Sequence, residues 1–149
     1  MTEQRERRYI VDYCRTKFPN ATIFYNFKLG GVPSSLHRDP NVAENPNIAM
    51  PWARYVDACV ILPDKMLLIE AKLPAKLEAV AQLMLYRQLV PKTPQLSQYL
   101  NRVLELRIVT ARPDPELVRF ANEQGIQVEI YQPDYAMEYL AVLLRGPVS

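Results

Sequence analysis

In the first thirty residues, apolar positions are first spaced as in a helix and then become nearly continuous, as in a strand. A stripe with intervals of three and four residues predicts a helix over 3–18, and its members are Arg7, Ile10, Val11, Cys14 and Phe18. A Pro-Asn pair ends this helix. The following stretch ATIFYNFKL, residues 21–29, is rich in β-branched and aromatic residues, so it predicts a strand that two glycines close.

Residues 54–73 have the pattern of a β-hairpin that leads into a helix. Apolar runs over 54–62 and 65–73 are separated by a Pro-Asp pair, which favours a turn because proline fixes φ at the second position. A helix is predicted next over 75–90, with an apolar stripe formed by Leu77, Val80, Ala81, Met84 and Leu85. Two prolines, at positions 91 and 94, end it.

The last third of the chain alternates between strands and helices. We predict a strand over 104–111, a helix over 114–125 framed by Asp, Pro and Gly at its ends, a strand over 126–132 and a helix over 134–145. An antiparallel hairpin followed by helical crossovers predicts an α/β domain whose central sheet is mixed.

Residues 30–52 contain four prolines and two glycines and lack any regular period. A loop of this length inside a compact domain is usually functional or mobile, and a passive insertion is the alternative. If the loop borders a site, the side chains that could contact a substrate are His37, Arg38, Trp52 and the adjacent Arg54.

The composition favours one globular domain over 1–149, with 49% hydrophobic and 23% charged residues and a net charge of +2. Arg5, Arg7 and Arg8 cluster near the start, where a solvated helix face is the simplest interpretation, although a basic chain is compatible with nucleic acid. The two cysteines lack metal-ligand spacing, which argues against zinc. No run of residues has the length of a membrane span or the character of a signal peptide. We therefore expect no membrane association and a reducing, cytoplasmic location.

The hairpin carries three charged residues where a buried strand would be apolar. A turn centred between Pro63 and Asp64 pairs residues whose numbers sum to a constant, so it places Asp57 opposite Glu70. Two opposed carboxylates repel each other and need a positive partner. Lys72, on the same strand face as Glu70, is one candidate, and a divalent cation such as Mg²⁺ is a better one because it takes carboxylate oxygens. An incidental surface ion pair is the alternative.

Asp57 followed by Glu70-Ala71-Lys72 resembles the signature of the PD-(D/E)xK nuclease superfamily. The order of elements also resembles the restriction-endonuclease-like αβββαβ core of that superfamily. The resemblance implies a Mg²⁺-dependent deoxyribonuclease in which Mn²⁺ can substitute. Asp57, Glu70 and the carbonyl of Ala71 would hold the metal, and Lys72 would be catalytic together with the two acids. One departure is that valine, not proline, precedes Asp57.

Gln82 and Tyr86 in the next predicted helix resemble the QxxxY motif of RecB-like and Cas4-type nucleases. Their spacing of four residues puts both on one helical face. Some members of the superfamily add an acid from the first helix, and Glu6 is the candidate for this accessory role. The alternative for Gln82 and Tyr86 is an ordinary position in an amphipathic helix, and the alternative for Glu6 is the common preference of the helix dipole for glutamate in a first turn.

These features predict a nuclease that hydrolyses phosphodiester bonds in DNA. The alternative is a module of the same fold that binds nucleic acid or protein without cutting. The sequence leaves open the form of the DNA and the choice between internal and terminal cleavage. A chain of this length has little room for a separate recognition domain, so a homodimer or a larger assembly could supply specificity.

Overall fold

A computed structural model describes residues 2–30 and 54–145. Its elements follow the predicted order, with boundaries within a few residues of those expected. The helices are α1 (Thr2–Lys17), α5 (Leu77–Leu89), α6 (Pro115–Glu123) and α7 (Asp134–Arg145). The strands are β1 (Thr22–Leu29), β2 (Arg54–Ile61), β3 (Lys65–Pro74), β4 (Val103–Arg112) and β5 (Ile126–Ile130). Two short 3-10 turns that were not predicted, Val90–Lys92 and Pro94–Tyr99, connect α5 to β4.

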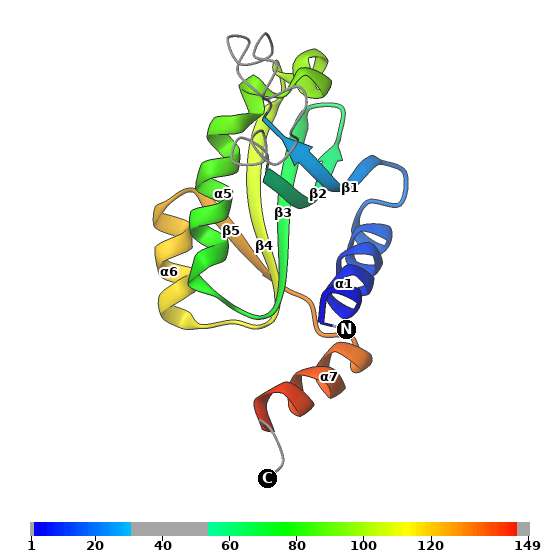
Figure 1. The fold of residues 1–149 in the computed structure, drawn as a ribbon, viewed down its shortest axis with the longest axis vertical. Coiled ribbons are helices and arrows are strands. Elements are labelled where there is room, and N and C mark those ends of the chain that lie inside the picture. Colours follow the sequence, from blue (N-terminus) through cyan, green and yellow to red (C-terminus); the bar gives the residue numbers. More distant parts are fainter. Residues whose placement is uncertain (1, 31–53, 146–149) are drawn as a thin grey trace, which may run out of the picture.

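The five strands form one mixed sheet in the order β1-β2-β3-β4-β5. The first three are antiparallel neighbours, and β3, β4 and β5 are parallel neighbours (Figure 1). The parallel pairs arise because α5 and α6 each carry the chain back to the start of the next strand. The prediction of a mixed α/β sheet is therefore confirmed.

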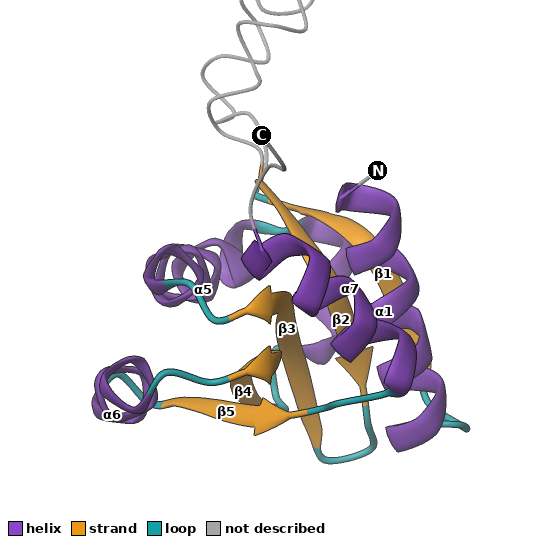
Figure 2. Cartoon of the chain, turned by 90° about the horizontal axis from the view of Figure 1, so that it is seen from below, coloured by secondary structure: helices purple, strands orange, loops and turns teal. Residues whose placement is uncertain are grey.

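Helices cover both faces of the sheet. Helices α5 and α6 lie on one side, and α1 and α7 lie on the other (Figures 1 and 2). Two separate clusters of buried side chains follow from this arrangement. The first packs α5 and α6 on the sheet, and the second packs α1 and α7 on the opposite face. Among the described residues, no helix is long and apolar enough to cross a membrane.

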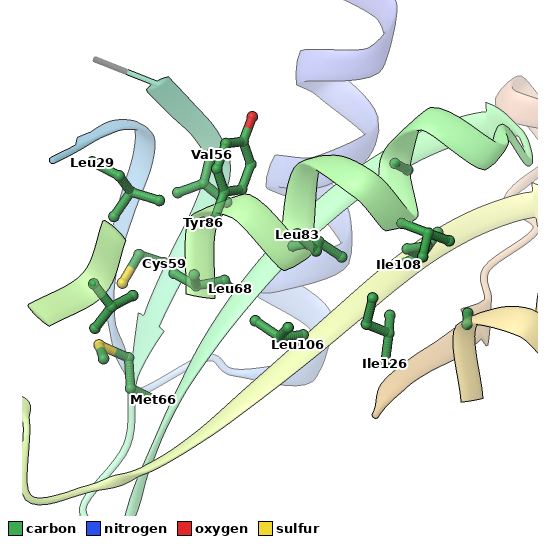
Figure 3. Packing of buried hydrophobic residues seen from close by; sticks show 14 of the residues in the cluster. Leu29, Val56, Cys59, Met66, Leu68, Leu83, Tyr86, Leu106, Ile108 and Ile126 are labelled. Atoms are coloured by element: carbon green, nitrogen blue, oxygen red, sulfur yellow. The ribbon is translucent and has the colours of Figure 1, made fainter. Parts of the chain in front are cut away.

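The buried face of α5 differs from the predicted stripe. Leu77 and Leu85 are 61% and 41% exposed, whereas Ala79, Leu83 and Tyr86 are buried. Figure 3 shows Leu83 and Tyr86 among the side chains of the first cluster. The predicted stripe is confirmed at Val80, which is buried, and at Met84, which packs against the first cluster, but it is wrong at Leu77, Ala81 and Leu85, which are exposed. Apolar residues occur on all sides of this helix, so that spacing alone selects no face. The correction turns Tyr86 toward the sheet.

Candidate active site

The register of the β2–β3 hairpin agrees with the prediction. Ala58 pairs with Ile69, so Asp57 and Glu70 occupy the next opposed position. Two hydrogen bonds join the strands there: the Asp57 N–H donates to Glu70 Oε1 at 3.2 Å, and the Ala71 N–H donates to Asp57 Oδ2 at 2.8 Å. Each carboxylate is thus held by a backbone donor of the partner strand. The hairpin fixes the two acids side by side.

Both acids are largely withdrawn from water. Glu70 is only 3% exposed, and its burial, followed by the nearby charge of Asp57, raises its pKa to about 8. Burial also raises the pKa of Asp57, while the hydrogen bond from Ala71 and the charge of Lys72 act in the opposite direction. A pair of carboxylates with raised pKa values, one buried and one partly buried, favours binding either a proton or a cation.

A cavity of about 510 Å³ opens next to the hairpin. Its lining comes from three strands and one helix: Glu6, Arg7, Ile10, Tyr25, Asn26, Asp57 and Lys72. The cavity therefore brings together Asp57 and Lys72 with Glu6, the accessory acid that the sequence indicated. Glu70 is not part of the lining, although it touches Asp57 through the hydrogen bond described above.

The ladder around Asp57 is interrupted on the β1 side. The pairs Tyr25–Ala58 and Phe27–Val56 flank a position where Asn26 has a φ of 47°. Among the described residues, Asn26 is the only one other than glycine with positive φ. In a regular strand, Val56 and Ala58 would point to the same face of the sheet. Val56 instead packs in the first cluster and Ala58 in the second, on the opposite face, so the alternation of side chains is interrupted at Asp57. Asn26 was not predicted from the sequence. The signal that could have found it is an asparagine, a residue that is rare in strands, within a strand rich in aromatic residues.

The two residues of the QxxxY-like pair behave differently. The hydroxyl of Tyr86 donates to the carbonyl of Tyr55 at 3.0 Å, two residues before Asp57. Burial raises the pKa of Tyr86, and the charges of Glu70 and Asp57 add to this effect, so the phenol lies near the acids. Gln82 Oε1 is buried without a hydrogen-bond partner among the described residues. The structure therefore joins Tyr86 to the site and records no such contact for Gln82.

The expected substrate contacts are only partly described. Most of the 30–52 loop lies outside the described residues, including His37, Arg38 and Trp52. Arg54 begins β2 and is exposed, three residues before Asp57. Its charge lowers the pKa of Tyr86 against the larger effect of burial, so its electrostatic influence reaches the Tyr86 hydroxyl.

The donor set for a metal consists of two carboxylates. No group of three or more His, Cys, Asp or Glu side chains within the described ranges has metal-binding geometry. The adjacent carboxylates of Asp57 and Glu70 nevertheless fit Mg²⁺, which usually binds one or two protein carboxylates and keeps water and substrate oxygens as its other ligands. The described residues thus fit a magnesium site better than an all-protein metal cage.

Comparison with known proteins supports the fold. No family model and no curated protein matches the chain. A repair endonuclease from Pyrococcus abyssi has a similar structure, with a TM-score of 0.50 and 13% sequence identity over 83% of this chain and 46% of that one. A protein of unknown function, AF1548, has a TM-score of 0.49 and 11% identity over 83% of this chain and 56% of that one.

The similarity to the repair endonuclease concerns the fold alone. The chain spans less than half the length of the repair endonuclease it matches. Together with the element order and sheet topology, the endonuclease similarity shows an α/β fold of the restriction-endonuclease-like type.

Proposed function

We propose that the protein is a metal-dependent DNA nuclease of the PD-(D/E)xK type that hydrolyses phosphodiester bonds. One observation carries the proposal. Asp57 and Glu70 are held together by reciprocal backbone hydrogen bonds in a setting that burial makes unfavourable for two negative charges. A hairpin without a ligand gains nothing from this arrangement, whereas a metal-binding hairpin requires it. The endonuclease-like fold supports the same assignment.

The residues would divide the chemistry as follows. Asp57, Glu70 and the Ala71 carbonyl would hold Mg²⁺ or Mn²⁺, and the ion would supply positive charge that polarises a phosphate and activates water for attack. Lys72 would orient the attacking water and offset the negative charge that develops on the phosphate. Water would add to phosphorus as the bond to the leaving oxygen breaks, and the proton that the attacking water gives up balances the one that the leaving oxygen takes up.

The accessory residues would act around this centre. Tyr86 supports the carbonyl of Tyr55 and hence the start of β2, and it approaches both acids. Glu6 lines the cavity and would hold a water or a second ion there. The QxxxY-like spacing of Gln82 and Tyr86 favours a nuclease of the RecB-like and Cas4-type branch.

DNA is the proposed substrate, with contacts from Arg54 and from His37, Arg38 and Trp52 in the loop. A homodimer or a larger assembly would add specificity. Both cysteines are free and buried, which supports a reducing compartment such as the cytoplasm.

The test is a cleavage assay on single-stranded, duplex, nicked and branched DNA with Mg²⁺ or Mn²⁺. Asp57→Ala should abolish metal binding, measured by calorimetry, together with cleavage. Lys72→Ala should retain metal binding but cut roughly 10²-fold more slowly, because it lacks only the positioned ammonium. If the parent binds these DNAs and cuts none with either metal, the chain is a non-catalytic binding module. A Lys72→Ala variant as fast as the parent would reduce Lys72 to an ion-pair partner.

A further inference from the structure

The three arginines near the start of α1 have different surroundings. The guanidinium carbon of Arg5 lies 3.9 Å from the ring centroid of Tyr139, and that of Arg8 lies 3.8 Å from the ring centroid of Tyr135. Both rings belong to α7, so these two cations join α1 to α7. Arg5 and Arg8 are three positions apart and therefore share a helical face.

Arg7 faces the candidate active site instead. It lines the 510 Å³ cavity with Asp57 and Lys72, and Ile10, three positions later, lines the same cavity. The side chain is exposed, and within the described part of the chain it takes part in no ion pair. Arg7 thus lies at the rim of a cavity that contains carboxylates, yet no carboxylate of the described residues forms an ion pair with it.

The charges of this cavity define what Arg7 could do. Glu6 and Asp57 would repel a phosphate backbone, and Lys72 comes from the same strand as Glu70 and serves the reacting phosphate in the proposed mechanism. Arg7 comes from a different element, so it approaches the cavity from the helix side. A guanidinium binds phosphate oxygens in a bidentate manner and keeps its charge at every working pH.

We infer that Arg7 is a nucleic-acid phosphate-binding residue at the rim of the candidate site, holding a phosphate next to the one that reacts. Arg5 and Arg8 are structural cations that fasten α7. The inference rests on the proposed function for the identity of the ligand. It is independent of whether the chain cuts, because a phosphate contact is also measurable in binding.

The experiment measures the affinity for a labelled oligonucleotide in Ca²⁺, as a function of salt between about 50 and 200 mM, where phosphate contacts dominate the salt dependence. Arg7→Ala should weaken binding about tenfold and reduce the slope of log affinity against log salt by roughly 0.7–0.9, the value of one phosphate contact. Arg7→Lys should restore most of the slope, because it restores the charge. Cleavage in Mg²⁺ is measured on the same proteins.

Arg8→Ala is the matched control. It removes the same charge from the adjacent position, so a general electrostatic effect would appear equally in both variants. We expect an unchanged salt slope and a lower melting temperature, because the contact with Tyr135 is lost.

The outcomes separate this inference from the proposed function. A slope reduced only in Arg7→Ala supports the inference even if the parent cuts no DNA, and the absence of cutting would then count against the nuclease alone. A parent that cuts, with an unchanged slope in Arg7→Ala, overturns the inference and leaves the nuclease standing. Equal slope losses in Arg7→Ala and Arg8→Ala overturn it too, and a parent without affinity for DNA contradicts both.

Discussion

Two groups of acidic side chains lie on the same sheet but have different partners. Glu105 and Glu129 both pair with Arg107. The guanidinium of Arg107 donates a hydrogen bond to Glu105, and one of its nitrogens lies 3.5 Å from a carboxylate oxygen of Glu129. Asp57 and Glu70, on neighbouring strands, are held by backbone N–H groups. The ion pairs of the described residues do not include either of them.

The network around Arg107 contains its own positive charges. Lys65 lies 3.3 Å from Glu105, Lys17 lies 3.7 Å from Glu129, and Arg107 also donates to the hydroxyl of Tyr13 at 2.8 Å. A network of this kind needs no ligand to balance its charge. Among the described residues, Lys72 is a cation whose charge lowers the pKa of both hairpin acids, but burial together with the charge of Asp57 raises the pKa of Glu70 to about 8. Buried charge that lacks an adjacent cation is therefore the better indicator of a functional site.

The largest expected effect concerns the network. Arg107→Met should lower the free energy of unfolding by about 3 kcal/mol, because it leaves two partly buried carboxylates without their common cation. Lys65→Met is the control: its side chain is 36% exposed, and an exposed pair contributes less than about 1 kcal/mol. Urea denaturation measures both. If the two variants lose equal stability, the network is not the structural unit described here.

The second effect concerns the hairpin and should depend on metal. Glu70→Gln keeps an oxygen that can accept from the Asp57 N–H but removes one negative charge. With Mg²⁺ at a hundred times its dissociation constant, the parent should gain about 2.7 kcal/mol of unfolding free energy, and Glu70→Gln should gain far less. Thermal unfolding with and without Mg²⁺ measures the difference. A parent whose melting temperature ignores both Mg²⁺ and Mn²⁺ would contradict a metal at this pair.

The fold could be predicted from the sequence because local signals agreed with one another. The Pro-Asp turn set the hairpin register, so the opposition of Asp57 and Glu70 followed from arithmetic on residue numbers. Asp114 caps α6 by accepting from the Glu116 N–H at 3.0 Å, as its position before a proline indicated. The buried face of α5 could not be predicted, because its orientation depends on tertiary packing of a helix that is apolar on several sides.

The candidate site was only partly accessible to sequence reasoning. The residues on one hairpin were found because strand geometry relates them directly. Arg7 and Asn26 were missed because they reach the cavity from α1 and β1, and the sequence does not state how those elements pack around the hairpin. The cluster of three arginines looked uniform in the sequence, whereas the structure separates Arg7 from its two neighbours.

A third effect should appear in the pH dependence of stability. The folded-state pKa of Glu70 is raised to about 8 by burial and by Asp57, from an ordinary value near 4.5. Between about pH 5 and pH 8 the folded state retains a proton that the unfolded state has lost, so the free energy of unfolding falls as pH rises through this window. The loss should exceed about 1 kcal/mol in the metal-free parent.

The difference between the parent and Glu70→Gln isolates this contribution, since other titrating groups are common to both. Melting temperatures recorded from pH 5 to pH 9 should converge or cross, with the variant becoming relatively more stable at high pH. Mg²⁺ should reverse the trend in the parent, because metal replaces the proton. Parallel curves for the two proteins would mean that Glu70 titrates normally.

The smallest effect concerns backbone strain. Among the described residues, the strained residue is Asn26, which lies beside the hairpin pair and not beside Arg107. Asn26, with a φ of 47°, lies where the β1–β2 ladder is interrupted next to Asp57. Asn26→Ala should cost about 1 kcal/mol, because alanine lacks the short polar side chain that lets asparagine tolerate this left-handed conformation, whereas Asn26→Gly should be nearly neutral because glycine has no Cβ. Urea denaturation of both variants measures the cost. We expect Asn26→Gly to keep the parent's rate of cleavage, since the backbone conformation, which opens the ladder at Asp57, is retained. Equal losses of cleavage in Asn26→Gly and Asn26→Ala would instead assign the role to the carboxamide, because that group is the one feature that both variants lack.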